Sequence, residues 1–551
     1  MISGPARRLL LTLAAACLTM VPPAFADQAP VVNAPAGAVM GLTQGPLNVF
    51  KGIPYAAPPV GKLRWKPPQP AAPWQGTLNT TKFGPACYQP TSKFVTIYTA
   101  DPGPMSEDCL SLNIWAPANA HNAPVFFWIY GGALWGGSSR DSLYDGARLA
   151  ERGVVVVTIN YRLGVLGWLA HPELSAESPL HISGNYGLLD QIAALRWVKH
   201  NIGAFGGDPA NVTIAGESAG GLSVLYLMAS PEARGLFTKA IAESAYMVST
   251  PLLKQNKYGM MSAEESGVEL AKALHAKDIT ALRTMDPATL TDDAAAAKFL
   301  PFGAVDGRIL PGQLVTVFDK GEEAHVPVLA GFNSGEIRSL RILAPKVPAS
   351  QTAYEKIIRA NYGDLADEFL KLYPPTNMEE SILATTRDAL YGWTAERMVR
   401  DQTRLGEPSY LYFFDHGYPA ADDAGLHAFH ASELPFVFGT IDRSPPHWPA
   451  IPQTPAEEKL SNAMVDYWAS FVKTGHPSAK GAPAWPAFDA TAAYMHFADV
   501  PRPSTHLLPG MYQLHEEVMC RRRAAGNIAW NWNVGLFSPP LPPKGLCGTA
   551  P

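Results

Sequence analysis

A serine flanked by glycines is the residue of this chain best suited to act as a nucleophile. Ser218 lies in the run Gly-Glu-Ser-Ala-Gly, residues 216–220, directly after the β-branched run 212–215 and directly before an apolar segment. This order predicts a strand, a sharp turn and a helix. On such a turn the serine hydroxyl projects above the sheet, and only glycines fit two positions before and after it. The N–H groups at the start of the helix also favour negative charge developing beside the serine, so the pattern predicts nucleophilic catalysis.

A nucleophilic serine needs a base to take its proton and an acid to orient the base. With this kind of turn, the acid and then the histidine follow the serine along the chain. Glu336 is the predicted acid, because it comes shortly after the apolar run 326–330. Asp306 is the competing acid, but it lies in an Asp-Gly turn, where an aspartate commonly serves the turn itself.

His430 is the predicted base, since it lies in a loop that enters an apolar segment and an imidazole titrates near neutral pH. A purely structural histidine is the alternative interpretation. His427 lies three residues earlier, so a His-x-x-His metal pair is also considered. No third ligand follows at a suitable spacing, and we predict no metal and no organic cofactor.

Backbone N–H groups are needed to hold negative charge on a substrate oxygen. The glycine-rich run 131–137 follows the apolar segment 124–130, and its glycines let the backbone approach a substrate closely. We expect the amides of Gly132, Ala133 and Ala219 to form an oxyanion hole. A glycine loop without this role is the alternative.

Continuous apolar runs bounded by turn residues predict the strands that position these groups. The runs are 124–130, 153–158, 212–215, 326–330 and 410–414. Continuous rather than alternating apolar character is typical of strands buried on both faces. Helices are expected between them, for example at 188–198 and 456–472. The alternation predicts an α/β fold with a mostly parallel central sheet flanked by helices, and helical insertions at 261–300 and 350–405.

The two ends of the chain have distinctive compositions. Residues 1–26 match a secretory signal, with paired arginines, a short apolar stretch and a small-x-small pattern at 24–26. We therefore expect export to a periplasm or the medium, with a lipid anchor at Cys17 as the minor alternative. No later apolar run approaches the length of a membrane span. Residues 27–551 are expected to form one domain that ends in an extended, proline-rich strap at about 521–551.

The cysteines outside the signal segment are Cys87, Cys109, Cys520 and Cys547. An even number in an exported protein favours disulfides, and pairing between sequence neighbours gives Cys87–Cys109 and Cys520–Cys547. Free buried thiols are the alternative.

The charge balance bears on the partners of the protein. The net charge is −5 and the pI is about 6.3, with lysines and arginines scattered along the chain. Nucleic-acid binding is disfavoured, because it would require a basic face. The sequence leaves the oligomeric state open, with a monomer favoured.

Short motifs along the chain carry a resemblance to a known family. They are 50–56, 63–65, 106–113, 160–162, 184–191, 205–209 and the turn at 216–220. On these motifs, from about residue 30 to 520, the chain resembles the type-B carboxylesterases, which include para-nitrobenzyl esterases, animal carboxylesterases and cholinesterases. The resemblance implies an α/β-hydrolase fold whose helical insertions cover an active-site gorge. It places Glu336 and His430 at the acid and base positions of the family.

The same resemblance implies further contacts around the site. These are the ion pairs Arg64–Glu107 and Arg162–Asp190 and a Cys87–Cys109 loop near the mouth of the gorge. Glu217, beside the nucleophile, is implied to organise the floor of the pocket.

This chain departs from the common family pattern at three places. Ala133 and Leu134 stand where relatives often have a third glycine and an aromatic residue, and Gly335 stands where they commonly have aspartate. The 87–109 loop contains Tyr88 and Tyr98 but no tryptophan. Because cholinesterases bind quaternary ammonium through a loop tryptophan by cation–π attraction, a choline ester is disfavoured.

These observations predict a serine hydrolase that cleaves small-molecule carboxylic esters through an acyl-enzyme intermediate. Trp135, Tyr246, Met247 and Phe429 are expected, with Glu217, to line its pocket. The same mechanism acting on amide, lactone or thioester bonds is one alternative. A catalytically silent binding relative is the other, but such a protein would usually lack one of the three catalytic side chains.

Overall fold

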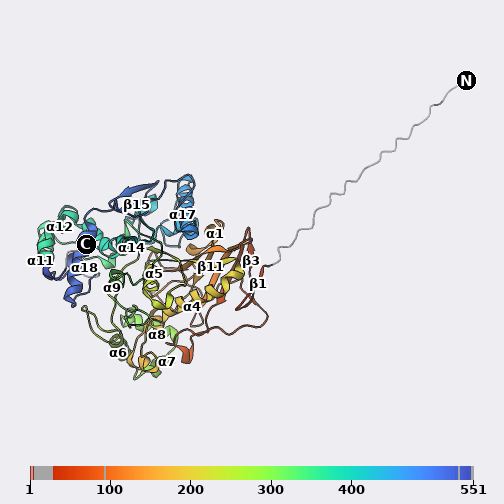
Figure 1. Ribbon diagram of the computed structural model, residues 1–551, viewed down its shortest axis with the longest axis horizontal. Coiled ribbons are helices and arrows are strands. Elements are labelled where there is room, and N and C mark those ends of the chain that lie inside the picture. Colours follow the sequence, from red (N-terminus) through yellow and green to blue (C-terminus); the bar gives the residue numbers. More distant parts are fainter. Residues whose placement is uncertain (2–3, 5–28, 92–94, 531–533, 548–551) are drawn as a thin grey trace.

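The computed structural model describes Met1, Gly4 and residues 29–91, 95–530 and 534–547 (Figure 1). Most of the predicted signal segment, with Cys17, lies outside these residues. In the described part of the chain, no helix combines the length and the apolar character that crossing a membrane requires.

An 11-stranded sheet forms the centre of the molecule, in the order β16-β15-β14-β13-β12-β11-β9-β10-β8-β4-β3. Its strands are β3 (Leu42–Gln44), β4 (Leu47–Pro54), β8 (Ser111–Pro117), β9 (Ala123–Ile129), β10 (Val155–Ile159), β11 (Gly207–Glu217), β12 (Lys239–Glu243), β13 (Val328–Asn333), β14 (Ser409–Phe414), β15 (Ala493–Phe497) and β16 (Pro501–Thr505). Neighbours from β15 to β10 in this order run parallel, and the pairs at both edges run antiparallel. The predicted mostly parallel sheet is therefore confirmed.

Both faces of the sheet are covered by helices, which explains the continuous apolar runs. Along β9, Val125 and Phe127 join an apolar cluster with α4 (Tyr186–Asn201) and α5 (Ala219–Ala229). Phe126 and Trp128, which alternate with them, join a second cluster with α17 (Pro455–Thr474). Since successive side chains of a strand point to opposite faces, a central strand is mostly apolar on both faces.

The segments predicted to be helical insertions are helical. The first contains α6 (Ala263–Ala273), α7 (Ile279–Thr284) and α8 (Pro287–Ala296), which lie together at the lower side of Figure 1. The second contains α11 (Gln351–Tyr362), α12 (Ala366–Leu372), α13 (Met378–Arg387), a π-helical turn η8 (Asp388–Gly392) and α14 (Trp393–Arg404). Helix α14 packs against β13 and β14, so this insertion reaches the sheet close to the strand that precedes Glu336.

The C-terminal segment is fixed to this insertion. Helix α18 (Met511–Ala525) packs against α14 and α12, and it extends into the first residues of the segment for which the sequence predicts a strap. After it the chain forms two short 3-10 turns, η9 (Gly535–Phe537) and η10 (Lys544–Leu546). A disulfide between Cys520 and Cys547 joins this tail to α18.

Candidate active site

Ser218 lies on a strained turn between β11 and α5. Its backbone has φ 56° and ψ −119°, a conformation that costs energy and persists only where the surrounding structure enforces it. A Cβ atom at Gly216 would lie 2.5 Å from the carbonyl carbon of Gly220, and one at Gly220 would lie 2.0 Å from the carbonyl oxygen of Ile129. The two glycines that flank the serine are therefore required by close backbone contacts.

Glu336 directs its carboxylate at the imidazole of His430. It is the first residue of the short helix α10 (Glu336–Ser339), which follows β13, and its side chain is fully buried. Oε1 accepts hydrogen bonds from Ser244 Oγ at 2.7 Å and from the Asn333 N–H at 2.8 Å. Oε2 accepts a hydrogen bond from Nδ1 of His430. Both oxygens thus have partners, which hold the carboxylate in place.

The second nitrogen of His430 faces Glu217 rather than the serine. Nε2 lies 3.0 Å from Oε1 of Glu217, within the range of an ion pair. Among the described residues the Ser218 hydroxyl donates to no side chain and accepts from none. The structure therefore joins the predicted acid and base directly, and it brings the base to the residue immediately before the predicted nucleophile.

Both carboxylates favour a charged imidazole. Burial opposes a charge on His430, but Glu217 and Glu336 outweigh it and raise the pKa of the imidazole well above its usual value. Burial also raises the pKa of Glu217, against the attraction of His430.

Two more buried glutamates lie within electrostatic range. Burial raises the pKa of Glu243 to about 8, although Trp468 Nε1 donates a hydrogen bond to its Oε1 at 2.5 Å. Burial, together with the negative charges of Glu217 and Glu243, raises the pKa of Glu433 well above its usual value. Both shifts favour the neutral acid, which limits the negative charge buried around His430.

Hydrogen bonds join the loop that presents the acid to the loop that presents the base. The N–H of Gly335 donates to the carbonyl of Ala428 at 2.8 Å, and Asn333 Nδ2 donates to the carbonyl of Phe429 at 2.8 Å. A Cβ at Gly335 would lie 2.7 Å from the carbonyl oxygen of Leu426 and 2.9 Å from that of Ala428. The close approach of the two loops thus explains why glycine stands at this position of the chain.

The glycine-rich loop after β9 passes beside the nucleophile. A Cβ at Gly131 would lie 3.1 Å from the Cβ of Ser218. Gly132, Ala133 and Leu134 have positive φ values of 105°, 55° and 60°, and Gly132 and Ala133 are exposed. In the described chain no residue accepts a hydrogen bond from the N–H groups of Gly132 or Ala133. The N–H of Ala219, in the first turn of α5, has no partner within its helix. Among the described residues, all three amides thus lack a hydrogen-bond acceptor.

The residues expected to line a pocket differ in their surroundings. Trp135 is partly exposed and its ring packs edge-on against Phe299, with centroids 6.2 Å apart. Tyr246 packs edge-on against Tyr391, with centroids 6.1 Å apart. Met247 and Phe429 have no exposed surface, and Phe429 packs against Trp448. These last two side chains therefore belong to the apolar core around the site.

Three contacts of the site were not anticipated from the sequence. Ser244 and Asn333 bind Glu336, and the ring of Tyr391 lies 5.3 Å from that of His430. Ser244 follows β12 and Asn333 ends β13, so their position at the carboxyl ends of neighbouring parallel strands could have indicated them. Tyr391 lies in the π-helical turn η8, for which the sequence gives no signal.

The competing candidates have other tasks. Asp306 Oδ1 accepts from the N–H groups of the three residues 308–310, so it serves its own turn. His427 pairs with Asp422 at 2.7 Å and with Asp415 at 3.3 Å. Among the described residues, no group of three or more histidines, cysteines and carboxylates is arranged to hold a metal ion.

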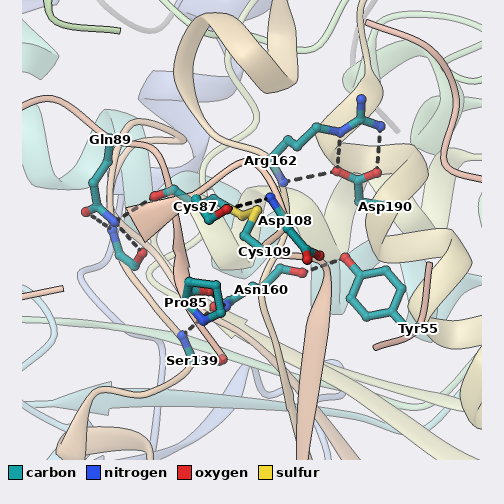
Figure 2. Close-up of a disulfide and its surroundings, with 12 residues drawn as sticks. Tyr55, Pro85, Cys87, Gln89, Asp108, Cys109, Ser139, Asn160, Arg162 and Asp190 are labelled. Atoms are coloured by element: carbon teal, nitrogen blue, oxygen red, sulfur yellow. Dashed lines mark hydrogen bonds and ion pairs between the residues drawn. A yellow bond between two sulfur atoms is a disulfide. The ribbon is translucent and has the colours of Figure 1, made fainter. Parts of the chain in front are cut away.

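The implied ion pairs and the first disulfide lie close to one another. Arg64 binds Glu107 through two bonds of 2.7 Å, and Arg162 binds Asp190 at 2.7 and 2.8 Å. Figure 2 shows the Cys87–Cys109 disulfide close to Arg162 and its partner. Both ion pairs are thus present as expected.

Comparison with known proteins gives matches over most of the chain. The sequence profile of the Carboxylesterase family matches residues 28–513. Fumonisin B1 esterase of Sphingopyxis macrogoltabida is 37% identical over 478 residues, which cover 84% of this chain and 85% of that protein. Para-nitrobenzyl esterase of Bacillus subtilis (strain 168) is 36% identical over 467 residues, 83% of this chain and 92% of that protein. A solved thermophilic PNB esterase superposes with a TM-score of 0.76 at 33% identity, covering 88% of this chain and 99% of that one.

Proposed function

Because the chain belongs to the carboxylesterase family and is a carboxylic ester hydrolase with the α/β-hydrolase fold, we propose that it is a serine esterase with a Ser218–His430–Glu336 triad. The observation that carries this proposal is the hydrogen bond of Glu336 to Nδ1 of His430 beside the strained turn at Ser218. Nδ1 donates to the carboxylate, so in the neutral imidazole Nε2 is the nitrogen free to accept a proton.

In the first step the Ser218 hydroxyl attacks the ester carbonyl and its proton passes to Nε2 of His430. For this transfer Nε2 turns from Glu217 to the neighbouring serine; catalytic hydrogen bonds commonly tighten only in the substrate complex. The negative oxygen of the tetrahedral intermediate is bound by the amides of Gly132, Ala133 and Ala219. Collapse of the intermediate releases the alcohol, which takes the proton from Nε2 and leaves an acyl group on the serine.

In the second step the same groups act on water. Nε2 takes a proton from a water molecule, the resulting hydroxide attacks the acyl carbonyl, and the proton returns to the Ser218 oxygen as the carboxylic acid leaves. Glu336 orients the imidazole through both steps, because its bonds to Ser244 and Asn333 fix it in place, and its carboxylate stabilises the imidazolium.

The proposed substrates are small-molecule esters of moderate size. The relatives named above include esterases of fumonisin B1 and of para-nitrobenzyl esters, whose substrates differ widely. A choline ester is not proposed, since the described part of the 87–109 loop offers tyrosines and no tryptophan for cation–π binding.

Labelling with a fluorophosphonate, followed by mass-spectrometric mapping of the adduct, tests the mechanism. We expect one adduct, on Ser218, and loss of ester hydrolysis in proportion to labelling. An adduct on another residue of the active protein would contradict the assignment. A panel of matched ester, thioester, lactone and amide substrates separates the proposed activity from its alternatives, since an esterase has its highest kcat/KM on the oxygen ester.

We also propose that residues 27–551 form one exported domain. Support for one domain comes from the central sheet, whose strands span residues 42–505. Support for export comes from the two disulfides, which persist in oxidising compartments. Cell fractionation with N-terminal sequencing tests this, and we expect the exported protein to begin at Asp27.

A further inference from the structure

The loop closed by the Cys87–Cys109 disulfide is held together at its base. Strands β6 (Ala86–Cys87) and β7 (Met105–Ser106) pair in parallel there, with Cys87 opposite Ser106. The disulfide adds a covalent link, and both cysteines are buried. The two chain ends of the loop therefore have fixed positions.

Near its start the loop contacts the proposed oxyanion loop through one side chain. Gln89 Nε2 donates to the carbonyl of Gly137 at 3.0 Å, and its Oε1 accepts from the N–H of Gly137 at 3.0 Å. Figure 2 shows Gln89 beside the disulfide. Gly137 has φ 110°, and a Cβ there would lie 2.5 Å from the ring of Tyr130, so this residue is tightly confined. The side-chain amide of Gln89 thus binds both the N–H and the carbonyl of Gly137, the last residue of the run 131–137.

Farther along, the same loop contacts the proposed base. The Tyr98 hydroxyl donates to the carbonyl of His430 at 2.8 Å and lies 2.7 Å from Ser339 Oγ. Ser339 Oγ in turn accepts from the His430 N–H and lies within donating distance of the Glu336 carbonyl, both at 3.3 Å. A carbonyl oxygen only accepts, so the Tyr98 hydroxyl donates its hydrogen bond to the His430 carbonyl. The Ser339 hydroxyl is then left to donate to the Glu336 carbonyl. Burial raises the pKa of Tyr98 well above its usual value, so the hydroxyl keeps its proton.

We propose that Gln89 and Tyr98, in the described parts of the 87–109 loop, form a clamp that positions the oxyanion loop and His430, the two groups that act together with Ser218. Gln89 sets the backbone of the oxyanion loop, and Tyr98 sets the backbone of His430. The inference rests on the proposed function, because it assigns these residues a task in that reaction. They are positioning residues, since neither side chain contacts the reacting atoms.

The contacts favour this role over ordinary packing of a surface loop. Both side chains bind backbone groups, and the residues they bind belong to the two segments that have to be aligned in the transition state. A misplacement of about 1 Å in such a segment costs on the order of a hundredfold in rate. The loop is also joined to the first helical insertion, because the N–H of Thr91 donates to Asp292 Oδ1 at 2.7 Å.

The test compares Gln89→Leu and Tyr98→Phe with matched controls. Tyr98→Phe keeps the ring and removes the hydroxyl, and Tyr88→Phe makes the same change elsewhere on the loop. Gln69→Leu is the control for Gln89→Leu, because Gln69 is outside the loop and, among the described residues, its side chain donates only to the Pro67 carbonyl. For each protein, kcat and KM on one ester, the rate of fluorophosphonate labelling and the melting temperature are measured, with assays well below that temperature.

We expect kcat and the labelling rate to fall between about tenfold and a hundredfold in Gln89→Leu and Tyr98→Phe, with KM changed by less than about twofold. The controls keep the wild-type values. A kcat within about twofold of wild type in both loop variants, or an equal loss in their controls, overturns the clamp. Should Tyr98→Phe fail to fold, Ser339→Ala, which removes the hydroxyl that contacts Tyr98 and accepts from the His430 N–H, has to show the same loss of kcat.

The outcome for the wild-type protein separates this inference from the proposed function. If wild-type protein is active but labelled elsewhere than on Ser218, the proposed function is wrong and the clamp is overturned with it. If Ser218 is labelled and the loop variants react like wild type, the clamp alone is overturned.

Discussion

Nε2 of His430 lies 3.0 Å from Oε1 of Glu217, while Nδ1 of the same ring binds Glu336. The imidazole therefore lies between two carboxylates, and their charges raise its pKa well above the usual value despite burial. A base has to be neutral to accept the serine proton, so the raised pKa restricts activity to higher pH.

Replacing Glu217 with glutamine removes one of these charges and keeps the shape of the side chain. The pKa of His430 then falls, so we expect the acidic limb of the kcat/KM profile to move to lower pH. The profile measured with a neutral ester checks this, because the substrate itself does not titrate. A limb that stays at its wild-type position, or moves to higher pH, would show that Glu217 does not set the protonation of the base.

Glu433→Gln is the matched control. Burial and the neighbouring glutamates raise the pKa of Glu433 well above its usual value, which favours the neutral acid, and glutamine mimics that form. We expect the limb to stay within experimental error of wild type. A shift as large as that of Glu217→Gln would mean that Glu433 is charged in the folded protein.

Glu336→Gln tests the acid. Glutamine keeps the size of the side chain but has lost the charge. When its oxygen accepts from Ser244 and Asn333, its NH2 group faces Nδ1 of His430, where the carboxylate oxygen accepts in the wild type. In serine hydrolases the equivalent loss lowers kcat about 10⁴-fold, because the imidazole takes the wrong tautomer. We expect a drop of that order, measured at the pH optimum, with the melting temperature monitored in parallel. Activity within about tenfold of wild type would point to another acid.

The sequence predicted the parts of this site that depend on local patterns. The turn at Ser218 was found because its glycines are required by contacts within a few residues. The main buried strands could be predicted because helices cover both faces of the sheet, which gives these strands continuous apolar runs. Strand β12 was missed, since Lys239 and Glu243 interrupt its apolar character although both are buried.

What could not be predicted from one sequence are contacts between distant segments. Glu217 and His430 are far apart in the chain, and only the fold brings their side chains together. The same is true of Tyr98, whose partner Ser339 lies 241 residues away. The sequence shows Gly335 as a departure from the family pattern, but it does not show why glycine is needed there. The need comes from the backbone of residues 426–428, which passes close to Gly335 only in the folded chain.

Gly335→Ala tests that close passage. A methyl group there meets the carbonyl oxygens of Leu426 and Ala428 at 2.7 and 2.9 Å, so the acid and base loops have to move apart. We expect the free energy of unfolding to fall by about 1–3 kcal/mol and kcat to fall with it. Denaturant unfolding and steady-state kinetics measure the two effects. Gly203→Ala is the control, because a Cβ at Gly203 has no neighbour within 4 Å; equal losses in both variants would contradict the steric explanation.

The disulfides give a prediction about stability. The residues they join are 22 and 27 positions apart, and closing loops of this length restricts the unfolded chain by about 3 kcal/mol for each bond. We expect Cys520→Ala/Cys547→Ala to lower the melting temperature while kcat remains near wild type, because the tail lies outside the proposed catalytic groups. Cys87→Ala/Cys109→Ala should lower both, since its loop contacts Gly137 and His430. Calorimetry and kinetics on the two double variants check this. Equal kcat in the two variants, with both melting temperatures lowered, would show that the first disulfide acts on stability alone.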